Sequence, residues 1–145
     1  MYHRGENNMS SEALVEKVSV NINTSTLSQI DLLVDGGHYS NRSDFINQAL
    51  RSELQRQQGL LERLIAQQEQ KNSDEDQWFI GIFRLTARDI AEMHQKGEHL
   101  RIRGYGLLHL PADCDEEQLY AVVDSIEVRG KVSASQAVKN HYGLK

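Results

Sequence analysis

The sequence has 145 residues, 39% of them hydrophobic, and a formal net charge of −5. Because a chain of this length buries a modest core, we expect one ordinary domain or two small modules that rely on oligomerisation. No apolar run is long enough to span a membrane or to form a secretory signal, which predicts a cytoplasmic protein without membrane contact. The single cysteine, Cys114, excludes a disulfide framework and a CxxC zinc motif.

The first 23 residues predict an arm followed by a strand. Residues 1–15 are polar without a sustained period, which predicts a flexible arm. From Lys17 to Asn23 apolar and polar residues alternate, a pattern typical of a half-buried strand. One face holds Val18, Val20 and Ile22, and the other holds Lys17, Ser19 and Asn21. A lone strand leaves its backbone edges unpaired, so we expect the same strand of a second copy to be its partner.

Two helices are predicted after the strand. Asn23 or Thr24 can cap the first, and Asp35-Gly36-Gly37 ends it. Its apolar stripe consists of Leu27, Ile30, Leu33 and Val34. The second helix opens at Asn41-Arg42-Ser43-Asp44. Its spacing of three and four continues to residue 68, although positions 57 and 68 are Gln and Gly59 lies between them. This spacing predicts an extended second helix that pairs weakly at its far end.

The stretch from Lys17 to about Gln57 resembles the ribbon-helix-helix family of CopG, Arc and MetJ type. The resemblance rests on the strand KVSVNI, the first helix, a glycine-containing turn with Tyr39, and the NRSD opening of the second helix, each with the usual length and spacing. It implies an α+β fold in which residues 16–68 form an intertwined homodimer, with the two strands joined in an antiparallel ribbon above four helices.

The resemblance also implies that the ribbon enters the major groove of double-stranded DNA. The outward residues Lys17, Ser19 and Asn21 would then contact base edges. Their chemistry suits this role, because lysine can donate to guanine, asparagine can pair with adenine, and serine can bond to several bases. The alternative interpretation is a polar face that is merely solvated.

Phosphate contacts are expected where the second helix begins. Ser43 can cap that helix while free backbone amides point outward, and Asn41 and Arg42 would lie beside the bound phosphate. Ser43 could equally serve as a cap without touching DNA. Because a chain of net charge −5 lacks the bulk positive charge usual in DNA-binding proteins, such contacts would depend on placement.

Residues 69–77 are acidic and polar and predict a linker to a second module, residues 78–145. We expect this module to have a small mixed α/β fold. It should begin with a strand in WFIGIFRL and a helix from Ala87 to about Lys96, which lies between Thr86 and Gly97. Two further strands should follow, one on each side of a helix in DEEQLYAVV. The strings LRIRG and IEVRG hint at an internal repeat of about 26 residues.

The sequence predicts no metal, no cofactor and no catalytic site. His94, His99, His109 and Cys114 are spread singly and do not match the ligand spacing of nickel-responsive ribbon-helix-helix proteins. The acidic residues at 113–117 fit a capped first helical turn better than an acid and base pair.

The function that we expect from the sequence is that of a non-enzymatic, sequence-specific DNA-binding transcriptional regulator, a repressor that occupies its operator as a homodimer or higher oligomer. Two alternatives remain open. The acidic charge favours both of them over a DNA-binding regulator. The chain could be an assembly protein that uses the ribbon-helix-helix module for dimerisation alone. It could also be an antitoxin whose second half wraps a toxin.

Overall fold

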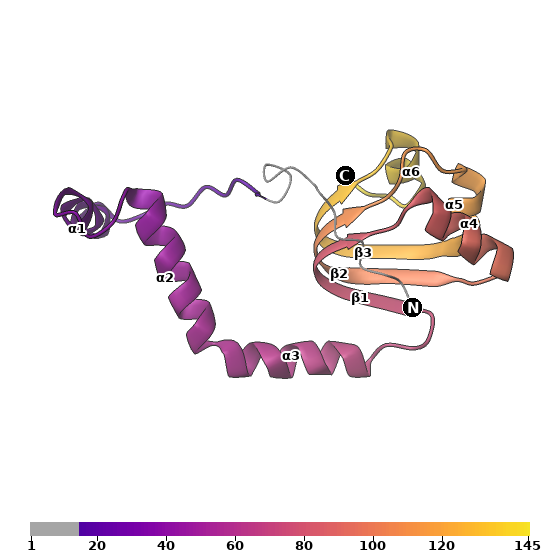
Figure 1. Cartoon of the computed structure of the whole chain (residues 1–145), viewed down its shortest axis with the longest axis horizontal. Coiled ribbons are helices and arrows are strands. Elements are labelled where there is room, and N and C mark those ends of the chain that lie inside the picture. Colours follow the sequence, from indigo (N-terminus) through magenta and orange to yellow (C-terminus); the bar gives the residue numbers. More distant parts are fainter. Residues whose placement is uncertain (1–14) are drawn as a thin grey trace. The chain divides into compact units, whose positions relative to one another are not determined.

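The computed structural model describes residues 15–145 and divides into two compact units between Ala66 and Gln67 (Figure 1). Residues 1–14 of the predicted arm lie outside the described residues. No helix among the described residues is long and apolar enough to cross a membrane. The chain combines helices and strands, as expected, and its sheet is parallel.

The N-terminal unit consists of an extended segment, residues 15–23, followed by helices α1 (Thr24–Asp35) and α2 (Arg42–Arg56) and most of α3 (Gln58–Gln70). Asn23 caps α1, since its side-chain Oδ1 accepts a hydrogen bond from the amide of Ser25 at 2.8 Å. Gly37, at φ +81°, lies just after the helix in a conformation that favours glycine. The predicted bounds of the first helix are therefore confirmed.

The prediction of an extended second helix is wrong, because α2 ends at Arg56 and α3 begins at Gln58. The amide of Gln57 donates to both Glu53 and Leu54, at 3.1 Å each, which tightens the last turn of α2. The carbonyl of Gln57 then accepts the first backbone hydrogen bond of α3 from Leu61. Gln57 is polar and Gly59 is a poor helix former, so the apolar spacing across this break supplies too little packing to keep one helix.

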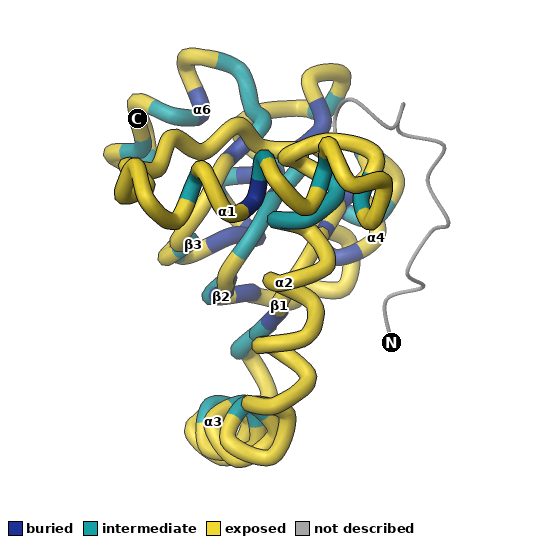
Figure 2. The backbone as a smooth tube through the Cα atoms, turned by 90° about the vertical axis from the view of Figure 1, so that its left-hand side faces the viewer, coloured by how far each residue is buried: buried dark blue, intermediate teal, exposed yellow. Residues whose placement is uncertain are grey.

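The N-terminal unit leaves most of its apolar side chains exposed in the single chain (Figure 2). Among its described residues Ile30 alone is fully buried, at 4% exposure. Larger exposures recur along the extended segment and along α1, α2 and α3: Val18, Val20, Ile22, Leu32, Leu33, Leu50, Leu54, Leu60 and Leu64. One copy of this unit therefore lacks a hydrophobic core of ordinary size.

The C-terminal unit repeats a strand and a helix three times. Its elements are β1 (Asp76–Arg84), α4 (Ala87–Lys96), β2 (Leu100–His109), α5 (Glu116–Val122), β3 (Val123–Ser133) and α6 (Gln136–His141). The strands form one parallel sheet in the order β1-β2-β3. The three predicted strands and the helices at α4 and α5 are confirmed, whereas α6 was not predicted. Residues 71–75 connect α3 to β1.

Helix α4 has the ends that its sequence predicts. Thr86 and Asp89 form a capping box, in which each side chain accepts the other residue's backbone amide, at 3.1 and 2.8 Å. Gly97 ends the helix in the left-handed conformation, at φ +67°. These local signals are sufficient to fix the helix at both ends.

The hydrophobic core of the unit lies between one face of the sheet and its helices. Inward residues of the strands pack with residues of α4, α5 and α6, and the central members are Phe79, Ile90, Ile102, Leu108, Leu119, Val122 and Val138. β1 and β2 keep a period of two, and β3 does so from Ser125 onward, after a register shift opposite Leu100 and Arg101. The residues between these inward positions therefore lie on the opposite face.

Three glycines at one level bring the strands close together. Gly81, Gly106 and Gly130 pair in register across the sheet, all with positive φ. A Cβ on Gly106 would lie 2.0 Å from the carbonyl oxygen of Gly81, and a Cβ on Gly130 would lie 2.0 Å from that of Gly106. This register makes the repeat 24 to 25 residues long with three copies, and it corrects the period of about 26 residues and the two copies that LRIRG and IEVRG indicated.

We predict that Gly106→Ala destabilises the C-terminal unit by at least about 3 kcal/mol, because a left-handed backbone strain and a backbone clash act together. Gly81→Ala is the matched control: its φ is +105°, but no atom lies within 4 Å of the added Cβ. Strain alone should cost it about 1 to 2 kcal/mol. Urea unfolding followed by the fluorescence of Trp78, the single tryptophan, measures both. If both variants lost the same free energy of unfolding, the clash between closely spaced strands would not contribute to the loss in Gly106→Ala.

Candidate nucleic-acid interface

The predicted base-contacting residues lie in the extended segment before α1. Lys17, Ser19 and Asn21 are exposed there, and no described residue of the same chain pairs with this segment as a strand. The apolar residues that alternate with them are exposed too, Val18 by 75% and Val20 by 73%. Both faces of the segment are thus open to solvent in the single chain.

The predicted phosphate-contacting residues lie together at the start of α2, but Asn41 and not Ser43 caps the helix. The Oδ1 of Asn41 accepts the amide of Asp44 at 2.8 Å, and the Oδ2 of Asp44 accepts the amide of Ser40 at 2.9 Å. Asn41 precedes the helix in extended backbone, which directs its side chain at the first turn, whereas Ser43 already lies inside that turn. The capping role expected for Ser43 is therefore wrong.

This arrangement leaves two backbone donors at the start of α2. The first helical residues have no carbonyl four positions earlier within the helix, and here the amide of Asp44 is used by Asn41. The amides of Arg42 and Ser43 have no acceptor among the described residues. They lie at the positive end of the helix dipole, where backbone amides favour an anion.

Arg42 forms a bidentate ion pair with Asp31 that joins α2 to α1. Its Nε lies 2.7 Å from Oδ1 and its Nη2 lies 2.8 Å from Oδ2. The hydrogen bond from Arg42 lowers the pKa of the Asp31 carboxyl, and the same bond raises the pKa of Arg42. Both side chains are about half exposed, so the pair adds little to stability. Eleven residues separate Arg42 from Asp31, so no local sequence pattern predicts this pair.

The carboxylate of Asp44 is a second negative charge at this end of α2. The backbone amide of Ser40 holds the pKa of Asp44 below its usual value, and the side chain of Gln48 acts in the same direction. Asp44 is therefore charged at neutral pH. Together with Asp31 it makes the approach to the α2 amides less positive than the residues Asn41, Arg42 and Ser43 suggest by themselves.

The turn before α2 is held by an aromatic contact. The ring of Tyr39 packs against the edge of Phe45, with centroids 4.9 Å apart and an interplanar angle of 81°. Tyr39 is partly buried, as expected of a packing residue. This contact fixes the chain that leads into Asn41 and so positions the cap.

No group of three or more His, Cys, Asp or Glu side chains that could hold a metal ion occurs within residues 15–145. The candidate ligands have separate partners: His99 pairs with Asp124 at 3.1 Å, His109 lies 3.2 Å from the hydroxyl of Ser133, and Cys114 donates to the carbonyl of Pro111. Burial lowers the pKa of His109 and raises the pKa of the Cys114 thiol.

The model of a ribbon-helix-helix transcriptional regulator family matches residues 13–139, which is most of the chain. The chain therefore belongs to this family, and membership assigns it a role in transcriptional regulation. The resemblance predicted for residues 17–57 is confirmed, and the match extends through the C-terminal unit. No curated protein and no solved structure matches the chain.

The caps of α2 can be tested by substitution. Because Asn41 accepts the amide of Asp44, we predict that Asn41→Ala lowers the free energy of unfolding by about 1 kcal/mol. Ser43→Ala removes a hydroxyl without a partner and should change it by less than about 0.5 kcal/mol. Urea unfolding at one fixed protein concentration, followed by far-ultraviolet circular dichroism, compares the two. If Ser43→Ala lowered the free energy of unfolding more than Asn41→Ala, Ser43 and not Asn41 would be the residue that caps α2.

Proposed function

We propose that the chain is a sequence-specific DNA-binding repressor whose extended segment pairs with that of a second copy and enters the major groove as an antiparallel ribbon. The observation that carries the proposal is the exposure of Val18 and Val20 in an alternating segment. Pairing two such segments over the helices of both chains buries these valines and the exposed leucines of α1 and α2. Membership of the ribbon-helix-helix family supports this assembly.

Burying the valines turns the other side of the ribbon outward. In a strand of period two, the side chains of Lys17, Ser19 and Asn21 then form one polar face. A two-stranded ribbon fits the major groove, where lysine and asparagine distinguish guanine and adenine by their hydrogen-bonding edges. These three residues are the proposed base contacts.

The start of α2 supplies the proposed phosphate contacts. The free amides of Arg42 and Ser43 and the side-chain amide nitrogen of Asn41 can donate to a phosphate oxygen. The guanidinium of Arg42 has further N–H groups besides the two that Asp31 accepts. Backbone amides carry no net charge, so a phosphate contact at the start of α2 does not require the chain to be basic. A DNA contact there is therefore compatible with an acidic chain.

Dimerisation should make thermal stability depend on concentration. Since one copy buries little apolar surface in its N-terminal unit, we predict that the melting temperature of that unit rises as the protein concentration rises. Far-ultraviolet circular dichroism measures the melting temperature, and sedimentation measures the oligomeric state of the same samples. A monomer at micromolar concentration with full helical content would contradict the dimer.

The base contacts and the phosphate contacts should respond differently to substitution. Asn21→Ala should leave the stability of the dimer nearly unchanged, because the side chain is exposed. It should weaken binding to the preferred DNA site by about 1 to 3 kcal/mol and weaken binding to random DNA very little. Arg42→Ala should weaken both to a similar degree and reduce the salt dependence by about one counterion. Selection from a random DNA pool followed by salt titrations provides the measurements.

Asp31 offers a further control on the role of Arg42. Asp31→Asn releases the guanidinium and should tighten binding to random DNA more than Asp35→Asn, which removes an equal charge from α1 without a partner to release. Equal effects would mean that Arg42 does not act on phosphate. Absence of any salt-sensitive DNA binding by the unaltered protein would overturn the proposed function.

A further inference from the structure

The sheet of the C-terminal unit has one face without helices. Parallel sheets are normally covered on both faces, and here α4, α5 and α6 pack against one of them. In proteins built from stacked strand and helix repeats, the open strand face is where partners bind. The side chains on this open face are Asp76, Trp78, Ile80, Ile82 and Arg84 on β1; Arg101, Arg103, Tyr105, Leu107 and His109 on β2; and Glu127, Arg129 and Lys131 on β3.

The open face is apolar along β1. Ile80 and Ile82 are 54% and 45% exposed, and Tyr105 on the neighbouring strand is 48% exposed. In the sheet register Ile80 lies beside Tyr105 and Ile82 beside Leu107, so these four side chains are neighbours across two strands. Isolated exposed aliphatic residues need no explanation, but a contiguous group on an uncovered sheet marks a contact surface.

The same face is cationic, whereas the rest of the unit is acidic. The open face carries five Lys or Arg against two Asp or Glu, Asp76 and Glu127, while the remaining residues from 71 onward carry five against ten. Arg101 pairs with Asp76 at 2.8 Å, and Arg103 donates to Asn72. Arg129 and Lys131 on β3 have no partner in the described part of the chain.

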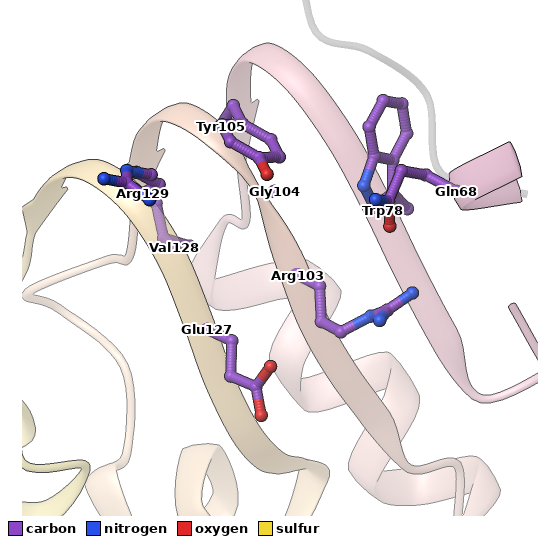
Figure 3. Close-up of a pocket in the computed structure, with 8 residues that line it drawn as sticks. All are labelled: Gln68, Trp78, Arg103, Gly104, Tyr105, Glu127, Val128 and Arg129. Carbon is purple, nitrogen blue, oxygen red and sulfur yellow. The ribbon is translucent and has the colours of Figure 1, made fainter. Parts of the chain in front are cut away.

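A hollow of about 340 Å³ lies on this face (Figure 3). Trp78, Arg103 and Tyr105 line it from β1 and β2, Glu127 and Arg129 line it from β3, and Gln68 near the end of α3 lies beside Trp78. Its volume is at the lower end of ligand sites and suits one large side chain of a partner. Apolar surface along β1, cations along β3 and the hollow between them make a two-sided docking surface.

We propose that this open face binds an acidic amphipathic segment of another protein. The apolar stripe of the segment would lie along Ile80, Ile82 and Tyr105, and its carboxylates would lie along Arg129 and Lys131. Complementary charge supports this occupant. A second copy of the same face is disfavoured, because two faces of like net charge would repel each other. A nucleic acid strand could stack on Trp78 and Tyr105, but it is less well matched, because Glu127 in the hollow would repel its phosphates and the exposed Ile80 and Ile82 would remain uncovered.

Trp78 is the single tryptophan and lines the hollow, so its fluorescence reports occupancy. The probe is a tryptophan-free amphipathic peptide of about 18 residues, with leucines on one helical face and glutamates on the other. Titrated into the full-length protein, it should shift the emission of Trp78 saturably. Control peptides with every Glu replaced by Gln, or every Leu by Ser, should each bind at least about tenfold more weakly.

Paired variants separate the two halves of the surface. The double change Arg129→Glu with Lys131→Glu, and the double change Ile80→Ser with Ile82→Ser, should each raise the Kd for the acidic peptide at least about tenfold. Arg88→Glu with Lys96→Glu on α4 is the matched control for charge and should leave the Kd unchanged within about twofold. Circular dichroism melts verify that each variant remains folded.

Three results would overturn the proposal. One is the absence of a saturable shift with the acidic peptide, and another is equal binding of the Gln peptide. The third is that a short single-stranded oligothymidylate binds more tightly than the acidic peptide. If the changes at Arg129 and Lys131 abolish that binding while the changes at Ile80 and Ile82 leave it intact, the face binds nucleic acid. Since Asn21 and Arg42 lie in the other unit, DNA binding by that unit serves as an independent internal control.

Discussion

The N-terminal unit carries more apolar side chains than one copy of it can bury. Ile30 is fully buried among its described residues, while valines of the extended segment and leucines of all three helices face solvent. Fully burying an exposed side chain of this size contributes about 1.5 to 3 kcal/mol of transfer free energy. The segment also has unpaired backbone groups on both edges. In the dimer that we propose, a second copy would satisfy both requirements at once, and the burial of the valines would determine which residues the outer face of the segment presents.

In the proposed dimer, the period of two along the extended segment would couple assembly to recognition. A shift of register by one residue would expose Val18 and Val20 and bury Lys17, Ser19 and Asn21, so burial of the valines would determine which residues face a ligand. The same period in the C-terminal strands divides core residues from the open face, where Trp78, Tyr105 and Arg129 lie. In the C-terminal sheet, and in the ribbon of the proposed dimer, a buried apolar set therefore selects the polar set that remains available for binding.

Net charge is a poor guide to the electrostatics of this protein. The chain is acidic as a whole, yet the open sheet face of the C-terminal unit is cationic, and the start of α2 presents uncharged backbone amides at a helix terminus. The Arg42 guanidinium illustrates the limits of residue type, because Asp31 occupies two of its donors. An anion at this place would have to compete with an existing carboxylate.

The sequence by itself determined the features that depend on near neighbours along the chain. The ends of α1 and α4, the three C-terminal strands and the ribbon-helix-helix family all followed from caps, glycines and periodicity, since these act within a few residues. Packing of distant segments decided the rest. The pairing of Arg42 with Asp31 and the alignment of Gly81, Gly106 and Gly130 depend on segments brought together in space. No local sequence pattern predicts these contacts, because the residues that interact are far apart in the sequence and come together only in the folded chain.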